Sequence, residues 1–317
     1  MKKIVIFGGG SGLSQLLKGI KLFPVEITAV VSVADNGGST GLLRRELKIP
    51  AVGDITKVML SMADTNQDVI DLMNYRFTKS KSLGIHSVKN LLLMALMDLK
   101  GNFASAMPVM EKLLDVKGNI LPLTEDNVDL VGITSSGKKV IGEHQLTKCA
   151  SKIVEVKYDK EITVNPKVIN AVKEADLIIF SSGSLLTSIV PHLIDKGLVD
   201  VINKAKGEKV YICNLFTQPG ETDGFTVKDH IDYLEKYLGK ESIDVVIANN
   251  EVISSDLAKK YRNEEQKDPV LLDMHELDES NIYVIKDKLF TIENGSYRHD
   301  ALKTGYLLFS YLMDGRK

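Results

Sequence analysis

Apolar positions along this chain change their period in a regular way, from runs of strand length to stripes that recur every three or four residues. Residues 2–7 form an apolar run, residues 13–21 place their leucines and Ile20 on one helical face, and residues 27–33 form a second run. This order predicts a strand, a helix and a strand. The two strands of such a unit are expected to be parallel, because a crossover helix joins them.

The same alternation resumes in the second half of the chain. Apolar runs predict strands at 177–180, 210–213 and 243–248, each followed by a polar loop and then by a helical pattern. Strands that alternate with helices are typical of a sheet with helices on both faces. We therefore expect an α/β protein of the Rossmann-like kind, with a mostly parallel sheet.

The sequence also indicates where the helices of this half begin and where one of them bends. A helix is predicted over 185–195, with a kink at Pro191, because proline lacks the N–H that the preceding turn needs. Thr226 and Asp229 have the spacing of a capping box at the start of another helix. A final apolar helix is predicted over 302–313.

Two short strands are predicted near the end, at 282–285 and 289–292. Only a few residues separate them, so they are expected to pair with each other across Asp287 and Lys288.

Two inserts interrupt the alternation. Residues 54–118 are expected to be mainly helical, with Asp54 and Ser87 as N-caps. Residues 119–160 are expected to form an antiparallel β-hairpin insertion, in which 128–134 pairs with 139–141. No flexible linker flanks either segment, so residues 1–317 are predicted to be a single domain.

Composition limits the classes of partner. The 317 residues include 44% hydrophobic and 26% charged residues, as in an ordinary globular protein. The formal net charge is −2 and there is no long basic run, which argues against nucleic acid as the main partner. Cys149 and Cys213 lack metal-ligand spacing, which favours a reducing compartment.

We expect a cytoplasmic protein with no membrane insertion. The longest apolar run, 91–97, is far shorter than the roughly 20 residues that span a bilayer, and it is expected to be a buried helix. The first strand begins directly at the amino end, so no signal peptide is predicted.

Four loops follow the apolar strands, at 8–12, 34–41, 181–184 and 214–225. They are rich in Gly, Ser, Thr and Asn. In a parallel sheet they open on one edge, where ligands bind. Convergent small donors suit a phosphorylated ligand, such as a nucleotide or a sugar phosphate. The dinucleotide fingerprint fails because Leu13 stands where its third glycine belongs, so a nicotinamide-dependent oxidoreductase is the least favoured class.

Three of these segments together resemble a known family. Residues 8–13, 33–41 and 217–224, the last reading Thr-Gln-Pro-Gly-Glu-Thr-Asp-Gly, resemble the YvcK/CofD-like family, and the resemblance runs over essentially the whole chain. It is closest to the bacterial branch, the gluconeogenesis factors. The resemblance implies a Rossmann-like fold with a helical and a hairpin insert.

The resemblance also implies a function. The bacterial branch looks like a binder of UDP-sugars, UDP-glucose or UDP-N-acetylglucosamine, with a regulatory role linked to growth on gluconeogenic carbon sources and to cell shape and wall synthesis. The archaeal branch, 2-phospho-L-lactate transferase, implies the alternative of a transferase acting on a nucleotide-activated phosphoester. The first reading favours a protein without catalysis, and oligomeric state stays open.

The loops and the resemblance together predict a nucleotide-sugar site, with Tyr261 and Arg298 assigned by the resemblance alone. Its predicted residues are Gly9, Gly10, Ser11, Gly12, Asp35, Asn36, Gly37, Gly38, Ser182, Gly183, Ser184, Asn214, Thr217, Gln218, Pro219, Gly220, Glu221, Thr222, Tyr261 and Arg298.

Several of these residues have a plain structural alternative. Asp35 ends a strand and is either an acid that binds a ribose or a turn residue. Asp35 and Asp54 together are weak candidates for holding Mg²⁺, although acids at helix starts are more often caps. Tyr261 either stacks on a ligand or packs in the core. Arg298 either forks onto a diphosphate or pairs with a surface acid.

The chain departs from the family pattern on the expected binding loops. Ser11 replaces a threonine and keeps its hydroxyl. The segment 52–57 lacks an arginine, 85–90 lacks two glycines, and 181–188 lacks a proline and a tyrosine. These departures leave the exact nucleotide and sugar open.

Overall fold

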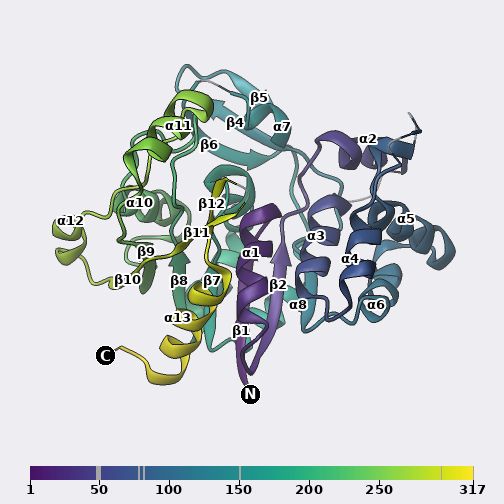
Figure 1. Ribbon diagram of the computed structural model, residues 1–317, viewed down its shortest axis with the longest axis horizontal. Helices are drawn as coiled ribbons and strands as arrows, with labels where there is room; N and C mark the ends of the chain where they lie inside the picture. The colour runs from purple at the N-terminus through teal and green to yellow at the C-terminus, as the bar shows by residue number, and fades with distance from the viewer. Residues whose placement is uncertain (48–50, 78, 81–82, 150, 294, 317) are drawn as a thin grey trace.

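The chain folds around a twisted parallel sheet, shown by a computed structural model (Figure 1). The structure describes residues 1–47, 51–77, 79–80, 83–149, 151–293 and 295–316. Within these residues the main sheet has the strand order β10-β9-β8-β7-β1-β2-β3, and every neighbouring pair is parallel. The predicted Rossmann-like α/β fold is confirmed. The reversal of strand order beside β1 puts the first glycine loop at the sheet's switch point, where ligands bind in such folds.

The strands and helices are as follows. The main sheet contains β1 (Lys2–Gly8), β2 (Val25–Val31), β3 (Asn119–Pro122), β7 (Leu177–Phe180), β8 (Glu208–Ile212), β9 (Val245–Asn249) and β10 (Tyr283–Asp287). The helices that surround it are α1 (Gly10–Ile20), α2 (Gly38–Leu47), α3 (Val52–Met62), α4 (Gln67–Asn74), α5 (Val88–Lys100), α6 (Phe103–Leu113), α8 (Pro166–Glu174), α9 (Lys196–Lys204), α10 (Val227–Leu238), α11 (Ser255–Glu265), α12 (Met274–Asp278) and α13 (Ala301–Asp314).

Both faces of the sheet are covered, because most positions in the middle of the strands are apolar. In β1, Ile4 and Ile6 belong to a core shared with α1, α3 and α13, whereas Val5 and Phe7 belong to a core shared with α8, α9 and α10. Side chains of a strand alternate between its faces, so a continuous apolar run needs helices on both sides. The confirmed helix at the carboxyl end, α13, lies beside α1 (Figure 1).

The expected pairing of the last two strands is wrong. Tyr283–Asp287 extends the main sheet parallel to β9, and the hairpin forms instead between β11 (Phe290–Glu293) and β12 (Ser296–His299). The reason is turn chemistry. Gly295 takes a φ of +73°, a conformation that glycine adopts without strain, whereas Asp287 and Lys288 offer no glycine for a tight turn.

Two helix starts also differ from the prediction. Asp54 is not an N-cap, because α3 begins at Val52 and places Asp54 inside the first turn. Ser87 does stand at the N-cap of α5, but its hydroxyl makes no capping hydrogen bond. The capping box of Thr226 and Asp229 is confirmed, with both reciprocal hydrogen bonds present.

The single helix predicted over 185–195 is wrong. The segment forms two short helical turns, η2 (Leu185–Ile189) and η3 (Val190–Leu193). Pro191 stands at the start of the second turn, where its missing N–H costs nothing but prevents one continuous helix.

The helical insert packs beside α1, β2 and β3, whereas the antiparallel insert lies beyond the carboxyl ends of the main strands (Figure 1). The helical insert comprises α3 to α6 with the single turn η1 (Leu83–Ile85), and residues 78, 81 and 82 of the predicted segment lie outside the described residues. The antiparallel insert contains β4 (Leu130–Thr134), β5 (Lys139–Ile141), α7 (Glu143–Leu146) and β6 (Ile153–Tyr158), in the order β5-β4-β6. It is narrower than predicted, because Asn119–Pro122 joins the main sheet as β3.

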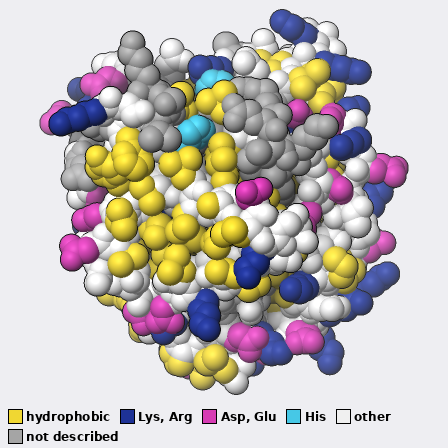
Figure 2. Space-filling view, turned by 90° about the vertical axis from the view of Figure 1, so that its right-hand side faces the viewer, with side chains coloured by type: hydrophobic (Ala, Val, Ile, Leu, Met, Phe, Trp, Pro, Cys, Tyr) yellow, Lys and Arg dark blue, Asp and Glu magenta, His cyan; other side chains and the backbone are white. Residues whose placement is uncertain are grey.

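Apolar side chains gather on the face formed by the helical insert (Figure 2). Exposed large apolar residues of this segment are Leu72, Tyr75, Phe77, Ile85, Leu99 and Leu113. Gatherings of this kind are a common property of contact surfaces. Within the described residues, no helix is both long and apolar enough to cross a membrane.

The crossing of α1 and α13 yields a test of the packing. A Cβ added at Gly19 would stand 1.7 Å from the carbonyl oxygen of Ala301, and one at Gly305 would stand 2.8 Å from the carbonyl carbon of Gly19. We expect Gly19→Ala to lower the free energy of unfolding by roughly 1–3 kcal/mol or more, since the helices must move apart. Urea denaturation measures this. Lys18→Ala, on the exposed side of α1, is the control, and equal stability of the two variants would contradict the close crossing.

Candidate functional site

The first glycine loop brings backbone against backbone. Gly9 is the N-cap of α1, and Gly10 takes a φ of +55°, which favours glycine. A Cβ at Gly12 would stand only 1.8 Å from the carbonyl oxygen of Ser182, so the start of α1 lies directly on the next loop. The free N–H groups of the first turn therefore face the sheet's carboxyl edge beside that loop.

The amide of Asn214 joins two further loops. It donates to the carbonyl of Gly183 at 2.7 Å and accepts from the N–H of Gly183 at 2.9 Å. The loop after β7 and the loop after β8 are thus held together by a pair of hydrogen bonds. This fixes both loops around the same opening.

Glu221 ties the Gln-Pro-Gly-Glu segment to the loop after β7. The hydroxyl of Ser184 lies 2.8 and 2.9 Å from the two carboxylate oxygens of Glu221, and it also accepts from the N–H of Thr187 at 3.0 Å. Burial raises the pKa of Glu221 to about 7, although the hydrogen bond from Ser184 opposes the rise. Glu221 is therefore close to its titration point near neutral pH.

Together these loops surround a pocket of about 460 Å³, which we name the neutral pocket. Its lining includes the predicted residues Gly9, Ser11, Gly12, Ser182, Gly183, Ser184, Asn214, Thr217, Gln218, Tyr261 and Arg298. Backbone groups, hydroxyls and amides dominate this wall. Two cations, Lys267 and Arg298, and one carboxylate, Glu265, also line it. Such a wall offers hydrogen bonds and positive charge to an anionic ligand.

A second pocket of about 430 Å³ continues from the first, and we name it the acidic pocket. Both pockets share Ser11, Ser184, Ser188, Gln218 and Lys267. The predicted residues Gly10, Asp35, Pro219 and Glu221 line only the acidic pocket, as do Asp54 and Glu143. The two pockets thus differ in charge while remaining continuous.

The acidic pocket raises the pKa of its carboxyls. Burial, and then the charge of Asp35, raises the pKa of Asp54 to about 6, against the opposing charge of Lys57. Burial, followed by Asp35 and Asp54, raises the pKa of Glu143 to about 7. With Glu221, three carboxyls that line the acidic pocket have pKa values near neutrality. Such a group of shifted pKa values is typical of a functional site.

Sequence reasoning missed several lining residues. Glu143 comes from the antiparallel insert, Lys57 from the second turn of α3, and Lys267 from the segment after α11. None belongs to a glycine-rich loop. The three polar residues at 143–145, beside an apolar hairpin, are the sequence signal that could have marked Glu143.

Other predicted residues build the loops without lining either pocket. Asn36 donates to Asp129 at 3.3 Å and accepts from the N–H of His144 at 3.1 Å, which ties its loop to the insert. The hydroxyl of Thr222 accepts from the N–H of Gln218 at 2.9 Å. These residues shape the loops from behind.

Three predicted glycines have backbone roles of the same kind. Gly37 donates its N–H to Asp35 at 2.8 Å, which is the turn role foreseen for that acid. Gly38 begins α2. Gly220 takes a φ of +77° and donates to Asp223 at 2.7 Å.

Tyr261 packs and lines the pocket at once. Its ring stacks on Phe216 with centroids 4.4 Å apart, and its hydroxyl accepts from the N–H of Tyr297 at 2.8 Å. Only 8% of the residue is exposed. Its ring therefore supports the wall that carries Arg298, the next residue after Tyr297 on β12.

Arg298 is exposed and faces the neutral pocket, and no described residue forms an ion pair or a side-chain hydrogen bond with it. Its neighbour His299 is fixed to the sheet, because a ring nitrogen lies 3.1 Å from the carbonyl oxygen of Cys213. Burial lowers the pKa of His299 to about 4, so the ring is neutral at physiological pH. The anchored hairpin thus presents a free guanidinium at the rim.

The proposed metal pair is close in space. Asp35 and Asp54 line the same pocket, and the charge of Asp35 raises the pKa of Asp54. The described part of the chain contains no group of three His, Cys, Asp or Glu residues placed to hold a metal ion. A hard cation would therefore take two protein carboxylates here and complete its shell with ligand or water oxygens.

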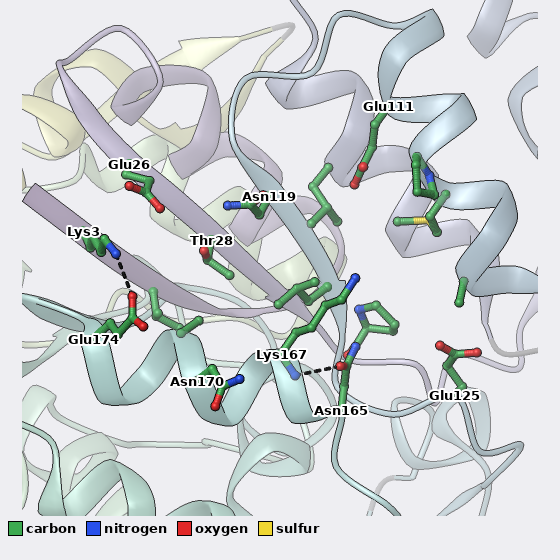
Figure 3. A pocket seen from close by; sticks show the side chains of 18 of the residues that line it. Lys3, Glu26, Thr28, Glu111, Asn119, Glu125, Asn165, Lys167, Asn170 and Glu174 are labelled. Atoms are coloured by element: carbon green, nitrogen blue, oxygen red, sulfur yellow. Dashed lines mark hydrogen bonds and ion pairs between the residues drawn. The ribbon is translucent and has the colours of Figure 1, made fainter. Parts of the chain in front are cut away.

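A further cavity, of about 360 Å³, lies at the opposite end of the strands (Figure 3). It is bounded by the start of β1, by α6 and by α8. An ion pair between Lys3 and Glu174, 2.6 Å apart, crosses its margin. None of the glycine-rich loops lines it, so it is separate from the two pockets described above.

The fold defines a Rossmann-like α/β protein whose two continuous pockets lie at the switch point of the sheet. More specifically, the chain belongs to the CofD family, since the family's sequence profile, described as 2-phospho-L-lactate transferase CofD, matches residues 4–290. The predicted family is confirmed.

Relatives of known name are similar over nearly the full chain. A Bacillus subtilis protein named gluconeogenesis factor is 42% identical over 313 residues, covering 98% of both chains. A Thermotoga maritima protein named putative gluconeogenesis factor is 42% identical over 310 residues, covering 95% of this chain and 96% of that protein. A crystal structure of a Bacillus halodurans protein superposes with a TM-score of 0.93 at 37% identity, over 97% of this chain and 99% of the other.

The raised carboxyl pKa values predict a pH dependence of stability. A carboxyl whose pKa is raised in the folded state contributes to the free energy of unfolding. For Glu143 this contribution is fully present below the unfolded pKa, near 4.5, and it is lost as the pH rises through the folded pKa, about 7. We expect Glu143→Gln to remove roughly 1–3 kcal/mol of the fall in unfolding free energy between pH 5 and pH 7.5. Urea titrations across this range measure it. Glu264→Gln, at an exposed position of α11, is the control, and parallel pH profiles for wild type and Glu143→Gln would refute the assignment.

Proposed function

We propose that this protein binds a UDP-sugar, UDP-glucose or UDP-N-acetylglucosamine, in the two continuous pockets and acts as a cytoplasmic regulator of the gluconeogenesis factor type. The observation that carries the proposal is the juxtaposition of a neutral pocket rimmed by cations with an acidic pocket rich in carboxylates. A nucleotide sugar has the same division, an anionic diphosphate joined to an uncharged sugar.

The neutral pocket suits the diphosphate. Backbone N–H groups at the start of α1 supply donors, and so does the hydroxyl of Ser11, which accepts from Lys57 and keeps its own hydrogen for a ligand. Arg298 offers a planar fork with no described partner to displace, and Lys267 adds a second charge despite its ion pair with Glu265. A diphosphate therefore meets two cations and a helix start.

The acidic pocket suits the sugar. Carboxylates accept hydrogen bonds from hydroxyls, and Asp35, Asp54 and Glu143 place several acceptors on one wall. A second phosphate would be repelled there, whereas a neutral hexose would not. The arrangement of the two pockets thus favours a nucleoside diphosphate sugar over a dinucleotide.

A regulatory role rests on the relatives' names. Proteins at 35–42% identity over nearly the whole chain are named gluconeogenesis factor. We infer for this chain the role implied by that branch, in growth on gluconeogenic carbon sources and in cell shape and wall synthesis, with the bound UDP-sugar as the signal.

A transferase is the second candidate, and the family's name and two carboxyl pKa values favour it. The family profile carries the name 2-phospho-L-lactate transferase. Asp54 and Glu143, with pKa values of about 6 and 7, have the protonation range of general bases. Incubation with a guanosine-activated phosphoester and a hydroxyl acceptor, followed by phosphorus NMR, tests this reading.

Ligand binding is expected to raise the melting temperature. A ligand bound by the native state alone stabilises it by roughly 2.7 kcal/mol at a hundredfold excess over Kd. Differential scanning fluorimetry with UDP-glucose, UDP-N-acetylglucosamine, GDP and NAD compares the candidates. If both UDP-sugars leave the curve unmoved at millimolar concentration while GDP shifts it, the uridine assignment is wrong.

Arg298 provides the sharpest single test. We expect Arg298→Ala to weaken UDP-glucose binding by about ten- to a hundredfold, because charge-assisted hydrogen bonds contribute about 1.5–3 kcal/mol. Arg298→Lys is expected to recover part of the loss, since lysine lacks the fork. Stability is expected to stay unchanged, because no described residue pairs with Arg298.

Calorimetric titration measures ligand affinity and urea denaturation measures stability. Applied to the same variants, they separate a ligand-binding role of Arg298 from a structural one. Arg316→Ala, at the carboxyl end of the chain and paired with Glu208 at 3.2 Å, is the control for loss of a surface arginine. Unchanged affinity together with lost stability in Arg298→Ala would remove Arg298 from the site.

A further inference from the structure

Three cations gather beside the acidic pocket, and we name them the cation cluster: Lys57, Arg76 and Lys89. Lys57 comes from α3, Arg76 from the segment after α4, and Lys89 from the first turn of α5. The charges that act on the amine of Lys89 are those of Lys57 and Arg76. Burial and these two like charges lower the pKa of Lys89 to about 8. The contacts of the neighbouring residues bring the three elements together: Thr56, beside Lys57, donates to Asn90, beside Lys89, at 2.9 Å, and Arg76 forms an isolated bridge with Ser87.

The hydrogen bonds of the cluster involve neutral partners. Lys57 donates to the hydroxyl of Ser11 at 2.6 Å, and Lys89 donates to the side-chain oxygen of Asn74 at 2.7 Å. Arg76 donates to the carbonyl of Ile85. No member forms an ion pair with a carboxylate among the described residues.

The start of α5 adds a second feature to the same place. Ser87, the N-cap, is 2% exposed, and its hydroxyl has no hydrogen-bond partner among the described residues. Residues 76 and 87 pair as an isolated antiparallel bridge, so Arg76 and this helix start are held side by side. A helix start with an unused hydroxyl favours an anion.

Like charges placed near one another cost free energy unless a counter-charge joins them. The three cations come from separate elements that meet at the start of α5. A tetrahedral dianion with three free oxygens can accept from several of them at once, which a planar carboxylate does less well. We propose that the cation cluster is a phosphate-binding subsite, which receives a phosphate group carried by a ligand at the margin of the acidic pocket.

The position of Lys57 connects the subsite to the rest of the site. Lys57 lines the acidic pocket and contacts Ser11, which is shared by both pockets. The diphosphate proposed above lies near Arg298, in the neutral pocket. Arg76 and Lys89 line neither pocket, so most of the cluster lies outside the space proposed for the main ligand. The subsite therefore suits a phosphate on a second small molecule. This inference does not require that the main ligand is a UDP-sugar.

Inorganic phosphate is the probe for the test. Isothermal titration calorimetry at fixed ionic strength, with chloride as the balancing anion, removes general screening effects. We expect Lys89→Met to weaken phosphate binding about tenfold or more, and Lys89→Arg to keep it within about threefold, because the charge is retained. Without phosphate, Lys89→Met is expected to melt no lower than the wild type, since it removes a repelled charge.

Lys100→Met makes the same substitution at the other end of α5 and is the matched control. Arg76→Gln is a second variant at an exposed position, and it is expected to weaken phosphate binding without unfolding the protein. Equal phosphate affinity in wild type, Lys89→Met and Arg76→Gln would overturn the proposal. So would equal affinity for succinate and phosphate, because the subsite would then not distinguish a tetrahedral dianion.

A further arm identifies the source of the phosphate. Titration of phosphate into protein saturated with UDP-glucose is expected to give the same affinity as titration into free protein, since the subsite serves a second molecule. Competition between the two would overturn that assignment and give the cluster to the nucleotide's own phosphates. Failure of UDP-glucose to bind would contradict the proposed function while leaving the phosphate titrations interpretable.

Discussion

The site depends on one steric constraint, the contact between the first turn of α1 and the loop after β7. A Cβ at Gly12 would stand 1.8 Å from the carbonyl oxygen of Ser182, and a Cβ at Gly8 would stand 2.1 Å from the hydroxyl of Ser181. The clash at position 12 is with backbone, so only glycine lets the helix start and the neighbouring loop meet so closely there, whereas at position 8 the Ser181 side chain would have to move. Because these backbones touch, the loops of β7 and β8 come within reach of the helix start, and the two pockets become continuous. A side chain at position 12 would separate the walls before it changed any charge.

Electrostatics inside this frame follow from burial. The acidic pocket gathers carboxyls whose pKa values rise because water is excluded and because they repel one another. In the cation cluster the effect has the opposite sign, because burial and like charges lower the pKa of Lys89. Lys57 stands between the two groups and acts on both, since its charge lowers the pKa of Asp54 and of Lys89. Charges that are costly in isolation are thus arranged as neighbours, which is typical of sites whose ligand completes the balance.

The sequence predicted the parts of the fold whose signals are local. Continuous apolar runs indicated buried parallel strands, and the spacing of Thr226 and Asp229 indicated a helix start, because both depend on nearby residues alone. Strand partners are not local, so Tyr283–Asp287 was assigned to the wrong neighbour, and its true partner is fixed by the main sheet. The glycine-rich loops located the pockets for the same local reason. Glu143, Lys57 and Lys89 escaped prediction because their role comes from distant elements that fold against the loops, and Thr222 was overestimated because a motif residue can serve its own loop.

The crossing of α1 and α13 at Gly19 and Gly305 has a consequence for the order in which the molecule forms. During synthesis the amino-terminal strand and helix emerge first, yet β1 needs β7, and α1 needs α13, which follows it by some 280 residues. Contacts of such long range form late and slowly. Docking of α13 therefore completes the support of α1, the helix that carries the first glycine loop at its start. The pockets beside that loop are in this way coupled to a contact some 280 residues further along the sequence.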